Sequence, residues 1–458
     1  MKKFAALLIL VLLMVPAFAQ DAAPKGFGFN LGLGSDLLPD PSDPTKFDNW
    51  SKLALRPEVA FGKFGMGLDL TLRFQFSSTG SSPLRIYEPD WIPNYNGNGT
   101  TVFDLYLPKI LYIRYGYQWE DPFYIKMGSI SDFSLGNGLI MDNYANTKFL
   151  PQKRLFGIQL GLDGSLFNFP YVGIEALTGN VSKFDVIGGR VYLKPLGFAK
   201  GLLGRLQIGA MGVYDKDPLV YLTAAEVAAY PPTQPIYVIG ADVTLPVLQG
   251  GLFSLTTFAE GAREFNEAMG LAAGVRGKIL RFIQYGAQVR FFQAGFIPAY
   301  FDGNYDLYRP DRFKTMIDTK PVPATTPYDP SFLAHLGFSV LNSSLSFAAT
   351  LDAPFSVFSG VPVGSTNQAD YPHVLGTVRL SRGLIPNTSI SAWYEKYYLG
   401  AETGNVFKEL IDPTNASIGM EVGYKAGTAL VTINYAYVYN RAKGAFDVKS
   451  SLSIGFEL

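Results

Sequence analysis

The chain has 458 residues, its 38 Lys and Arg side chains are matched by 38 Asp and Glu side chains, and it contains no cysteine. Balanced charge argues against a nucleic-acid-binding protein, which needs a basic stripe. The lack of cysteine excludes disulfides, thiolate metal sites and thiol catalysis. Aromatic residues and glycine are frequent, yet no stretch after Gln20 is apolar for long enough to form a transmembrane helix.

The first residues predict a signal peptide that covers residues 1–19. Two lysines follow the first methionine, an apolar run covers residues 4–15, and residues 17–19 read Ala-Phe-Ala, a small-x-small cleavage sequence. The run is too short to span a membrane as a helix, and no cysteine follows it to carry a lipid anchor. We expect residues 20–458 to form one domain, because no linker, proline run or charge block divides them.

An alternation of apolar and polar residues predicts strands from Gly26 onwards. From Met66 to Ser77 one face carries Met, Leu and Phe, whereas the other carries Asp69, Arg73 and uncharged polar residues. Because successive strand residues point to opposite sides of a sheet, such a strand has one apolar and one polar face. The pattern recurs in the segments Phe27–Leu33, Phe156–Leu162, Ile283–Phe291, Leu345–Leu351 and Ile418–Tyr424.

The number of these segments predicts an all-β fold that consists of a single closed antiparallel transmembrane β-barrel. We count about 20 strands, with about 18 as the alternative, and bacterial barrels require an even number. Tight connections are expected at Gly62–Gly65, Gln118–Pro122, Leu341–Ser344 and Lys425–Thr428. Long polar ones are expected at Ser78–Thr101, Ser129–Lys153, Asp215–Pro235, Gln293–Pro330 and Asp352–Pro372. Short periplasmic turns and longer external loops are typical of such barrels, so we expect both termini on the periplasmic side.

The end of the chain supports this interpretation. Leu452, Ile454, Phe456 and Leu458 alternate with Ser, Gly and Glu residues. The segment resembles the C-terminal strand of bacterial outer-membrane β-barrels, although the last residue is Leu where that class most often has Phe. The resemblance is porin-like and identifies no specific family. It implies a location in the bacterial outer membrane, contact with outer-membrane lipid, and recognition by the barrel-insertion machinery.

Inward-facing positions of the expected strands carry many charges, which a water-filled lumen would keep solvated. We interpret them as a pore wall that steers solutes. The alternative is a lattice of ion pairs that only braces the barrel. The two signs nearly balance, so strong ion selectivity is not expected. The candidate pore-lining residues are Arg56, Asp69, Arg73, Arg114, Lys126, Arg190, Arg205, Asp242, Arg276, Arg290, Arg379 and Glu421.

The segment Ser129–Lys153 is a candidate constriction loop. It mixes apolar residues with Asn and Asp, and two glycines at positions 136 and 138 allow it to bend. General porins narrow their channel with the third external loop, which this segment resembles in position and length. Arg73 and Arg114 would then face its acidic residues across the pore; the alternative is a loop that caps the rim. The candidate constriction residues are Asp132, Leu135, Asn137 and Asp142.

Catalytic and metal-binding motifs are weak in this sequence. Its two histidines, His335 and His373, do not lie in a G-x-S-x-G or H-E-x-x-H motif. Asp302, Asn304 and Asp306 have the spacing that begins a calcium loop, but Leu307 replaces the required glycine. We therefore expect no enzyme, no metal and no cofactor.

The favoured function is passive diffusion of small hydrophilic solutes across the outer membrane. A substrate-specific transporter for hydrophobic or other small molecules is the first alternative, although only residues 21–25 remain to form an N-terminal plug. A structural or adhesive surface barrel is the second alternative. Partners would be lipid, the insertion machinery and small solutes, with no nucleic acid. The sequence leaves the transported solute and the oligomeric state open.

Overall fold

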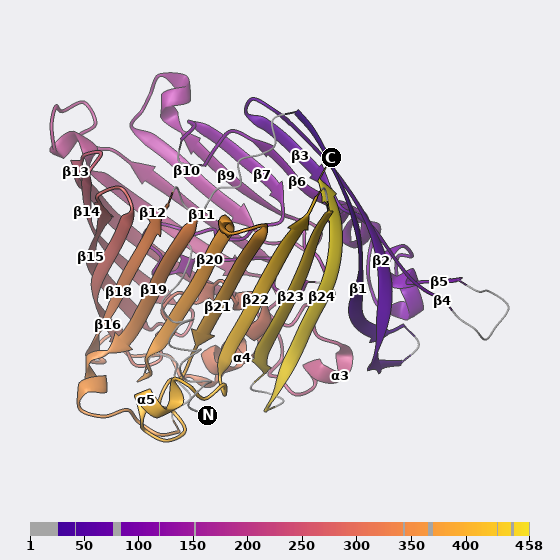
Figure 1. Ribbon diagram of the computed structural model, residues 1–458. Coiled ribbons are helices and arrows are strands. Elements are labelled where there is room, and N and C mark those ends of the chain that lie inside the picture. Colours follow the sequence, from indigo (N-terminus) through magenta and orange to yellow (C-terminus); the bar gives the residue numbers. More distant parts are fainter. Residues whose placement is uncertain are drawn as a thin grey trace.

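The computed structural model describes residues 26–41, 43–76, 84–118, 120–150, 153–341, 344–364, 370–427, 429–440 and 444–457. The expected signal peptide and Leu458 lie outside these residues. Strands dominate the described part of the chain and form one large antiparallel barrel (Figure 1).

The barrel of the described residues has 20 strands when β3 and β4 are counted as two halves of one strand. The first half of the chain forms β1 (Gly26–Asp40), β2 (Asp43–Phe61), β3 (Phe64–Leu68), β4 (Leu70–Phe76), β6 (Ile110–Tyr115), β7 (Phe123–Gly128), β9 (Gly157–Asp163), β10 (Val172–Thr178), β11 (Val186–Leu193) and β12 (Gln207–Asp215). The second half forms β13 (Ile236–Gln249), β14 (Phe253–Glu264), β15 (Met269–Ile279), β16 (Ile283–Gln293), β18 (Tyr328–Val340), β19 (Leu345–Pro354), β20 (His373–Ile385), β21 (Thr388–Lys396), β22 (Ala416–Ala426), β23 (Ala429–Asn440) and β24 (Ala445–Glu457). The predicted fold class and strand number are therefore confirmed.

The connections contain the remaining elements. These are the short strands β5 (Leu84–Ile86), β8 (Met141–Asp142) and β17 (Phe301–Asp302), and the helices α2 (Val102–Tyr106), α3 (Ala224–Val227), α4 (Tyr305–Asp318) and α5 (Val406–Glu409). None of the helices in the described ranges is long and apolar enough to cross a membrane.

Pairing between the first and last strands closes the barrel. Each strand pairs with its neighbour in the chain, and β1 also pairs with β24, in a register that places Leu33 opposite Ile454. The two end strands pair over residues 30–36 of β1 and 451–457 of β24, which closes the sheet and leaves no free edge along that part of the described strands. This is the condition that a sheet must satisfy in hydrocarbon, where no water is present to bond those groups.

The outer surface of the strands is apolar. Val191, Ile239, Leu336 and Ile433, from strands distributed around the barrel, are each at least half exposed. Their immediate neighbours in sequence point into the barrel because strand residues alternate. An apolar band around a closed barrel is suited to lipid and unfavourable in water. The chain is therefore an outer-membrane β-barrel.

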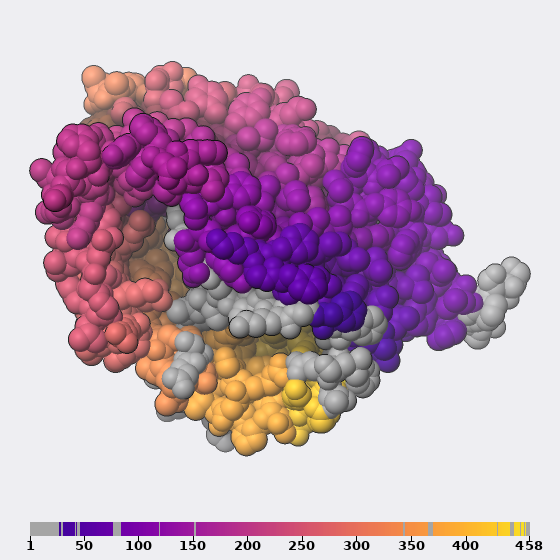
Figure 2. Space-filling view, turned by 90° about the horizontal axis from the view of Figure 1, so that it is seen from above, coloured from indigo at the N-terminus to yellow at the C-terminus, as the bar shows by residue number. Residues whose placement is uncertain are grey.

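The two ends of the barrel differ in their connections. Only two residues join β2 to β3 and β20 to β21, whereas residues 129–156 join β7 to β9 and residues 294–327 join β16 to β18. The short connections lie at the upper end in Figure 1, together with the end of β24, and α3, α4 and α5 lie toward the other end. Seen from the short-connection end, the molecule is hollowed inside the ring of strands (Figure 2).

Some of the abundant glycines make room for large inward-facing side chains. A Cβ atom on Gly419 would lie 2.0 Å from Trp393 on the neighbouring strand, and a Cβ atom on Gly173 would lie 2.1 Å from Tyr192. Each aromatic ring therefore lies flat over a glycine of the adjacent strand. This packing lets wide side chains cover the inner surface without blocking the lumen.

The lipid-facing surface can be tested with two neighbouring residues of β23. Ile433 is half exposed on the outside, and Asn434 faces the lumen, where its side chain is 3.4 Å from Ser451. We expect Ile433→Arg to lower the free energy of unfolding by about 2–4 kcal/mol, because arginine near the bilayer midplane loses its hydration. The matched variant Asn434→Arg should cost much less. Unfolding by urea in lipid vesicles measures both, and a larger cost at Asn434 would mean that the assignment of faces is inverted.

The orientation in the membrane can be tested by cysteine labelling, because the chain has no native cysteine. Phe407 in α5 and Leu341 in the turn after β18 are both well exposed, and they lie at opposite ends of the barrel. A membrane-impermeant maleimide should label Phe407→Cys on intact cells and should label Leu341→Cys only after lysis. Labelling of Leu341→Cys alone on intact cells would reverse the orientation.

Candidate functional site

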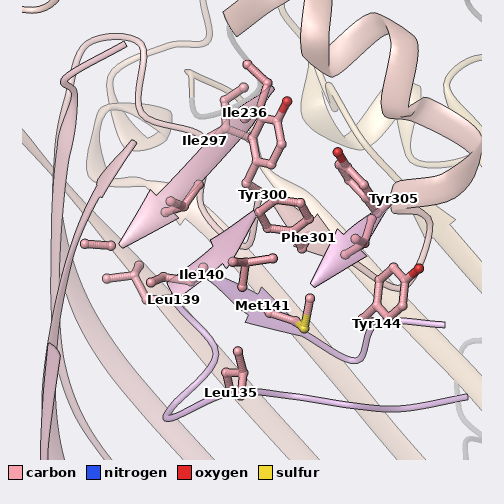
Figure 3. Close-up of a cluster of buried hydrophobic side chains, with 14 of the residues drawn as sticks. Leu135, Leu139, Ile140, Met141, Tyr144, Ile236, Ile297, Tyr300, Phe301 and Tyr305 are labelled. Atoms are coloured by element: carbon pink, nitrogen blue, oxygen red, sulfur yellow. The ribbon is translucent and has the colours of Figure 1, made fainter. Parts of the chain in front are cut away.

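The loop that joins β7 to β9, described for residues 129–150 and 153–156, folds into the barrel. Leu135, Ile140 and Met141 are completely buried and pack in one apolar cluster (Figure 3). The cluster includes inward-facing residues of the strands, such as Val213 of β12 and Val238 of β13. The apolar residues of this loop thus pack against the inner wall. Its role as a constriction stays a prediction.

A buried carboxylate on the wall holds the tip of this loop. Glu260 of β14 accepts hydrogen bonds from the backbone amides of Asn137, at 2.7 Å, and Leu139, at 3.2 Å. The Asn137 amide side chain also donates to Thr244 of β13, at 3.2 Å. The turn is possible because Gly136 adopts a positive φ angle of 58°, which a residue with a side chain rarely adopts.

The loop of residues 294–327 also folds inward and joins the first. Its strand β17 pairs in parallel with β8, so that Phe301 lies opposite Met141. Tyr300, Phe301 and Tyr305 are fully buried in the same cluster (Figure 3). We call residues 129–156 and 294–327 the inner loops.

The second inner loop contains the 14-residue helix α4, although the sequence analysis predicts only a long polar connection there. Pro310 in the middle of the segment obscures the helix, because proline removes a backbone donor and usually interrupts a helix. The spacing of its buried residues does indicate a helix. Tyr305, Arg309, Arg312 and Met316 recur at intervals of three or four, which is helical periodicity.

Ion pairs that are shielded from solvent fix α4 to the wall. The Arg309 side chain is 1% exposed; its Nε lies 2.6 Å from Asp215 at the end of β12, and its Nη1 lies 2.7 Å from Asp185. The Tyr305 hydroxyl donates to the same Asp215 carboxylate. Within the loop, Arg312 pairs with Asp302 at 2.5 Å. These contacts hold the helix in one position, because release would leave buried charges without partners.

The electrostatics of the inner loops follow from this burial. The pKa of Asp306 is raised to about 7, because burial disfavours its charged form even though Arg309 is near. The pKa of Arg309 is raised well above its ordinary value: burial opposes this, but the negative charges of Asp215 and Asp185 outweigh it. The guanidinium is therefore charged at any physiological pH.

The predicted calcium-like spacing has a different explanation. Asp302 accepts from Arg312 and from Tyr397, at 2.7 Å, while Asn304 donates to Glu395 of β21. Asp306 instead faces Tyr144, at 3.3 Å. The three side chains therefore contact different partners and do not form one ligand set.

Several predicted pore residues form a network on the wall. Arg190 of β11 contacts Asp242 of β13, at 2.7 Å, and Glu175 of β10, at 3.4 Å. Arg290 of β16 pairs with Asp352 of β19, at 2.6 Å. The other predicted wall residues at inward strand positions are Lys126 in β7, Arg276 in β15, Arg379 in β20 and Glu421 in β22.

Two of the predicted pore-lining residues do not lie on the wall beside the inner loops. Arg205 is not on a strand: it lies in a short 3-10 helix, η5 (Leu203–Arg205), in the connection before β12. The local sequence alternates leucine with small or polar residues and so imitates a strand. Arg114 is on β6 but near the short-connection end, where it donates to the Gly116 carbonyl at 2.8 Å and stacks on Tyr117. It therefore does not face the tip of the first inner loop.

The inner loops leave open space against one side of the barrel. A cavity of about 460 Å³, here called the lumen cavity, lies between these loops and the wall formed by β1 to β4 and β21 to β24. Its charged lining residues are Asp36, Lys52, Arg56, Asp69, Arg73, Lys148 and Arg154. Three of the predicted pore residues are among them. The sequence analysis missed Lys148 and Arg154 because both lie in a loop, outside the strand alternation.

The candidate constriction residues of the first inner loop do not line the lumen cavity. Asp142 accepts from Ser134 at 2.8 Å, and Asp132 lies 3.2 Å from the Ser131 hydroxyl. Burial raises the pKa of Asp142 above its ordinary value. The residues of this region that contribute to the cavity lining are Ser131, Ala145, Thr147, Lys148, Leu150 and Arg154.

Comparison with known proteins places the chain in no family. No family model matches the sequence, and no curated protein matches it. Among solved structures, similarity is found to the FrpB iron transporter of Neisseria meningitidis, with 11% identity over 96% of this chain and 83% of that chain and a TM-score of 0.38. Wzi of Escherichia coli, described as a carbohydrate-binding β-barrel, gives 11% identity, 95% and 84% coverage and a TM-score of 0.33. OccK5 (OpdH) of Pseudomonas aeruginosa has 10% identity over 94% of this chain and 98% of that chain, with a TM-score of 0.32. Scores this low carry no information about the solute or partner of this chain.

The importance of Arg309 can be tested against a second ion pair on the same helix. Arg309→Met leaves Asp215 and Asp185 buried without their cation and should destabilise the packed position of α4 by about 3–5 kcal/mol. Lys314→Met breaks an exposed pair with Asp318 and should change little. The rate at which chymotrypsin cleaves the folded barrel within residues 294–327 measures this release. Equal cleavage of both variants would show that the Arg309 pairs do not hold the helix.

Proposed function

We propose that this chain is an outer-membrane channel for passive diffusion of small hydrophilic solutes. The observation that carries the proposal is the lumen cavity, which lies inside a closed barrel and is lined largely by charged and polar side chains. Its volume is in the range of about 300–1,000 Å³ that accommodates small molecules. Charged side chains in such a space need water, a polar solute or an ion-pair partner, and the open cavity beside these ion pairs has room for water and solute.

The inner loops would act as a sieve in this mechanism. They fill the side of the lumen next to β10 to β16 and leave the passage along β1 to β4 and β21 to β24. Solute size would be limited by the distance between loop and wall. Lys148 and Arg154 from the loop, together with Arg56 and Arg73 from the wall, would orient polar solutes as they pass.

A substrate-specific channel is the second candidate. Its support is the rigidity of the inner loops, which are held by Glu260 and Arg309 in buried contacts. A fixed constriction can select solutes by shape as well as by size. Such a channel would show saturable transport of its own substrate and poor diffusion of unrelated solutes of equal size.

Deletion of Gly136–Asn143 should enlarge the channel. These residues include β8 and the loop tip, and their contacts with the wall run through the Glu260 and Thr244 side chains and apolar packing. The strand ladders should form without them. Single-channel conductance in planar bilayers should rise at a fixed salt concentration, and larger solutes should pass.

The matched control is deletion of Pro362–Gly364, an exposed segment of the connection after β19. Its removal should leave conductance unchanged. Equal conductance of the intact chain and the Gly136–Asn143 deletion would reject the sieve. An intact protein that conducts no ions would reject the channel and favour a structural or adhesive barrel.

A further inference from the structure

The acidic side chains on one side of the barrel interior do not line the lumen cavity. On the side of β10 to β14, Glu175, Asp242 and Glu260 are all less than 10% exposed. Two of them pair with Arg190, and the third holds the tip of the first inner loop. These carboxylates are therefore covered, and solute in the lumen cavity does not reach them.

The open side has an excess of cations. Asp36 is shared by Lys52, at 2.5 Å, and Arg73, at 3.0 Å. Asp69 is likewise shared by two guanidinium groups. Arg154 lies 2.6 Å and Arg56 lies 3.2 Å from its carboxylate.

The lining of the lumen cavity thus contains two carboxylates and five cations, Lys148 included, and one of those cations, Arg73, also pairs with Asp90. The Nη1 atom of Arg154 is buried and has no hydrogen-bond partner among the described residues. The acidic residues present therefore do not use all the donors of this cluster.

A second cavity continues the basic lining. The side cavity has a volume of about 250 Å³ and shares Asp69, Arg73 and Arg154 with the lumen cavity. It adds Lys109 and Lys153, and the carboxylates of Asp90 and Asp104. Asp90 is paired with Arg73 at 2.7 Å, and Asp104 with Lys183 at 3.2 Å. Together the linings of the two cavities contain seven cations and four carboxylates, so the cationic excess persists in the side cavity.

A third cavity, near the short-connection end, differs from these two in the charge of its lining. It has a volume of about 430 Å³, and its charged lining residues are Glu120, Asp121, Asp163, Glu175 and Lys194. Asp121 pairs with Lys63 and Asp163 pairs with Lys194, whereas Glu175 shares Arg190 with Asp242. This cavity therefore lacks the excess of positive charge that the lumen cavity and the side cavity share.

We propose that the lumen cavity is a binding site for small oxyanions, such as carboxylates or phosphate, and that the channel conducts them in preference to cations. Guanidinium groups match the planar pair of oxygens of a carboxylate and also bind phosphate, and an ammonium group adds a point charge. Trp393, Ser417 and Asn434 provide an aromatic surface and neutral polar groups beside the cations. The inference rests on the proposed channel function and adds its solute class.

The site explains why a balanced sequence can yield a selective channel. Equal numbers of Lys plus Arg and Asp plus Glu suggest no selectivity, but the covered acids near β10 to β14 do not line the lumen cavity and so do not offset the cations that line it. Selectivity depends on the charges within about a Debye length of the passing ion, roughly 8 Å at physiological salt.

The first test is ion selectivity of the whole protein in planar bilayers. Under a KCl gradient the reversal potential should show that chloride permeates faster than potassium. Succinate or inorganic phosphate, added at constant ionic strength, should reduce the chloride current in a saturable way, whereas glucose and putrescine should not. Block by one oxyanion alone would identify which of the two the site accepts.

Two variants change the charge of the site in opposite directions. The double variant Arg56→Gln and Lys148→Gln should lower the chloride-to-potassium permeability ratio about threefold or more, because each nearby charge changes the local ion concentration about twofold to threefold. Asp69→Asn should raise the ratio. Lys408→Gln, on the exposed external helix α5, removes a cation outside the cavity and should leave the ratio unchanged.

The outcomes separate this inference from the proposed function. A channel that conducts without preferring chloride, and that neither oxyanion blocks, overturns the inference and leaves the diffusion channel intact. Absence of conductance rejects both. If a variant fails to insert, the intact protein's reversal potential and its block by succinate and phosphate still decide the question.

Discussion

The structure depends on one constraint: in hydrocarbon every backbone N–H and C=O group must find a partner within the protein. A sheet meets this condition only by closing, and pairing of β1 with β24 closes it here. Closure fixes an inside and an outside for every strand. Alternation then places one set of side chains in lipid and the other around the lumen, so the constraint on the backbone also determines where charges can be placed.

A closed barrel of this size encloses more space than the wall side chains fill, and the inner loops occupy much of it. Their cluster is as apolar as the core of a soluble domain, and buried contacts at Glu260 and Arg309 hold it to the wall. The interior therefore has two parts. One is packed and fixed, and the other is a polar cavity along β1 to β4 and β21 to β24.

The barrel, its strand number and its loop pattern could be predicted from the sequence, because period-two alternation is a local property of each strand. The apolar content of residues 129–153 also indicated that this segment packs inside. The contacts between the inner loops could not be predicted, since the pairing of Met141 with Phe301 joins residues far apart in the chain. Helix α4 was missed because of Pro310, and Arg205 was misplaced because a short turn imitates a strand.

The distribution of charge inside the barrel could not be predicted from the sequence either. Composition gives the number of acidic and basic residues but not which of them are covered. Only the fold shows that Glu260 is buried against the first inner loop whereas Arg154 lines the lumen cavity. The roles proposed for the wall and loop residues depend on one claim, which is that the inner loops narrow the lumen without sealing it.

That central claim is tested most directly by the swelling of proteoliposomes in isotonic solutions of neutral sugars of increasing size, which measures passage independently of charge. The account predicts rapid swelling with a pentose or hexose and none with a tetrasaccharide. Absence of swelling with every sugar would contradict an open lumen, and equal swelling with all of them would contradict a narrowing by the inner loops.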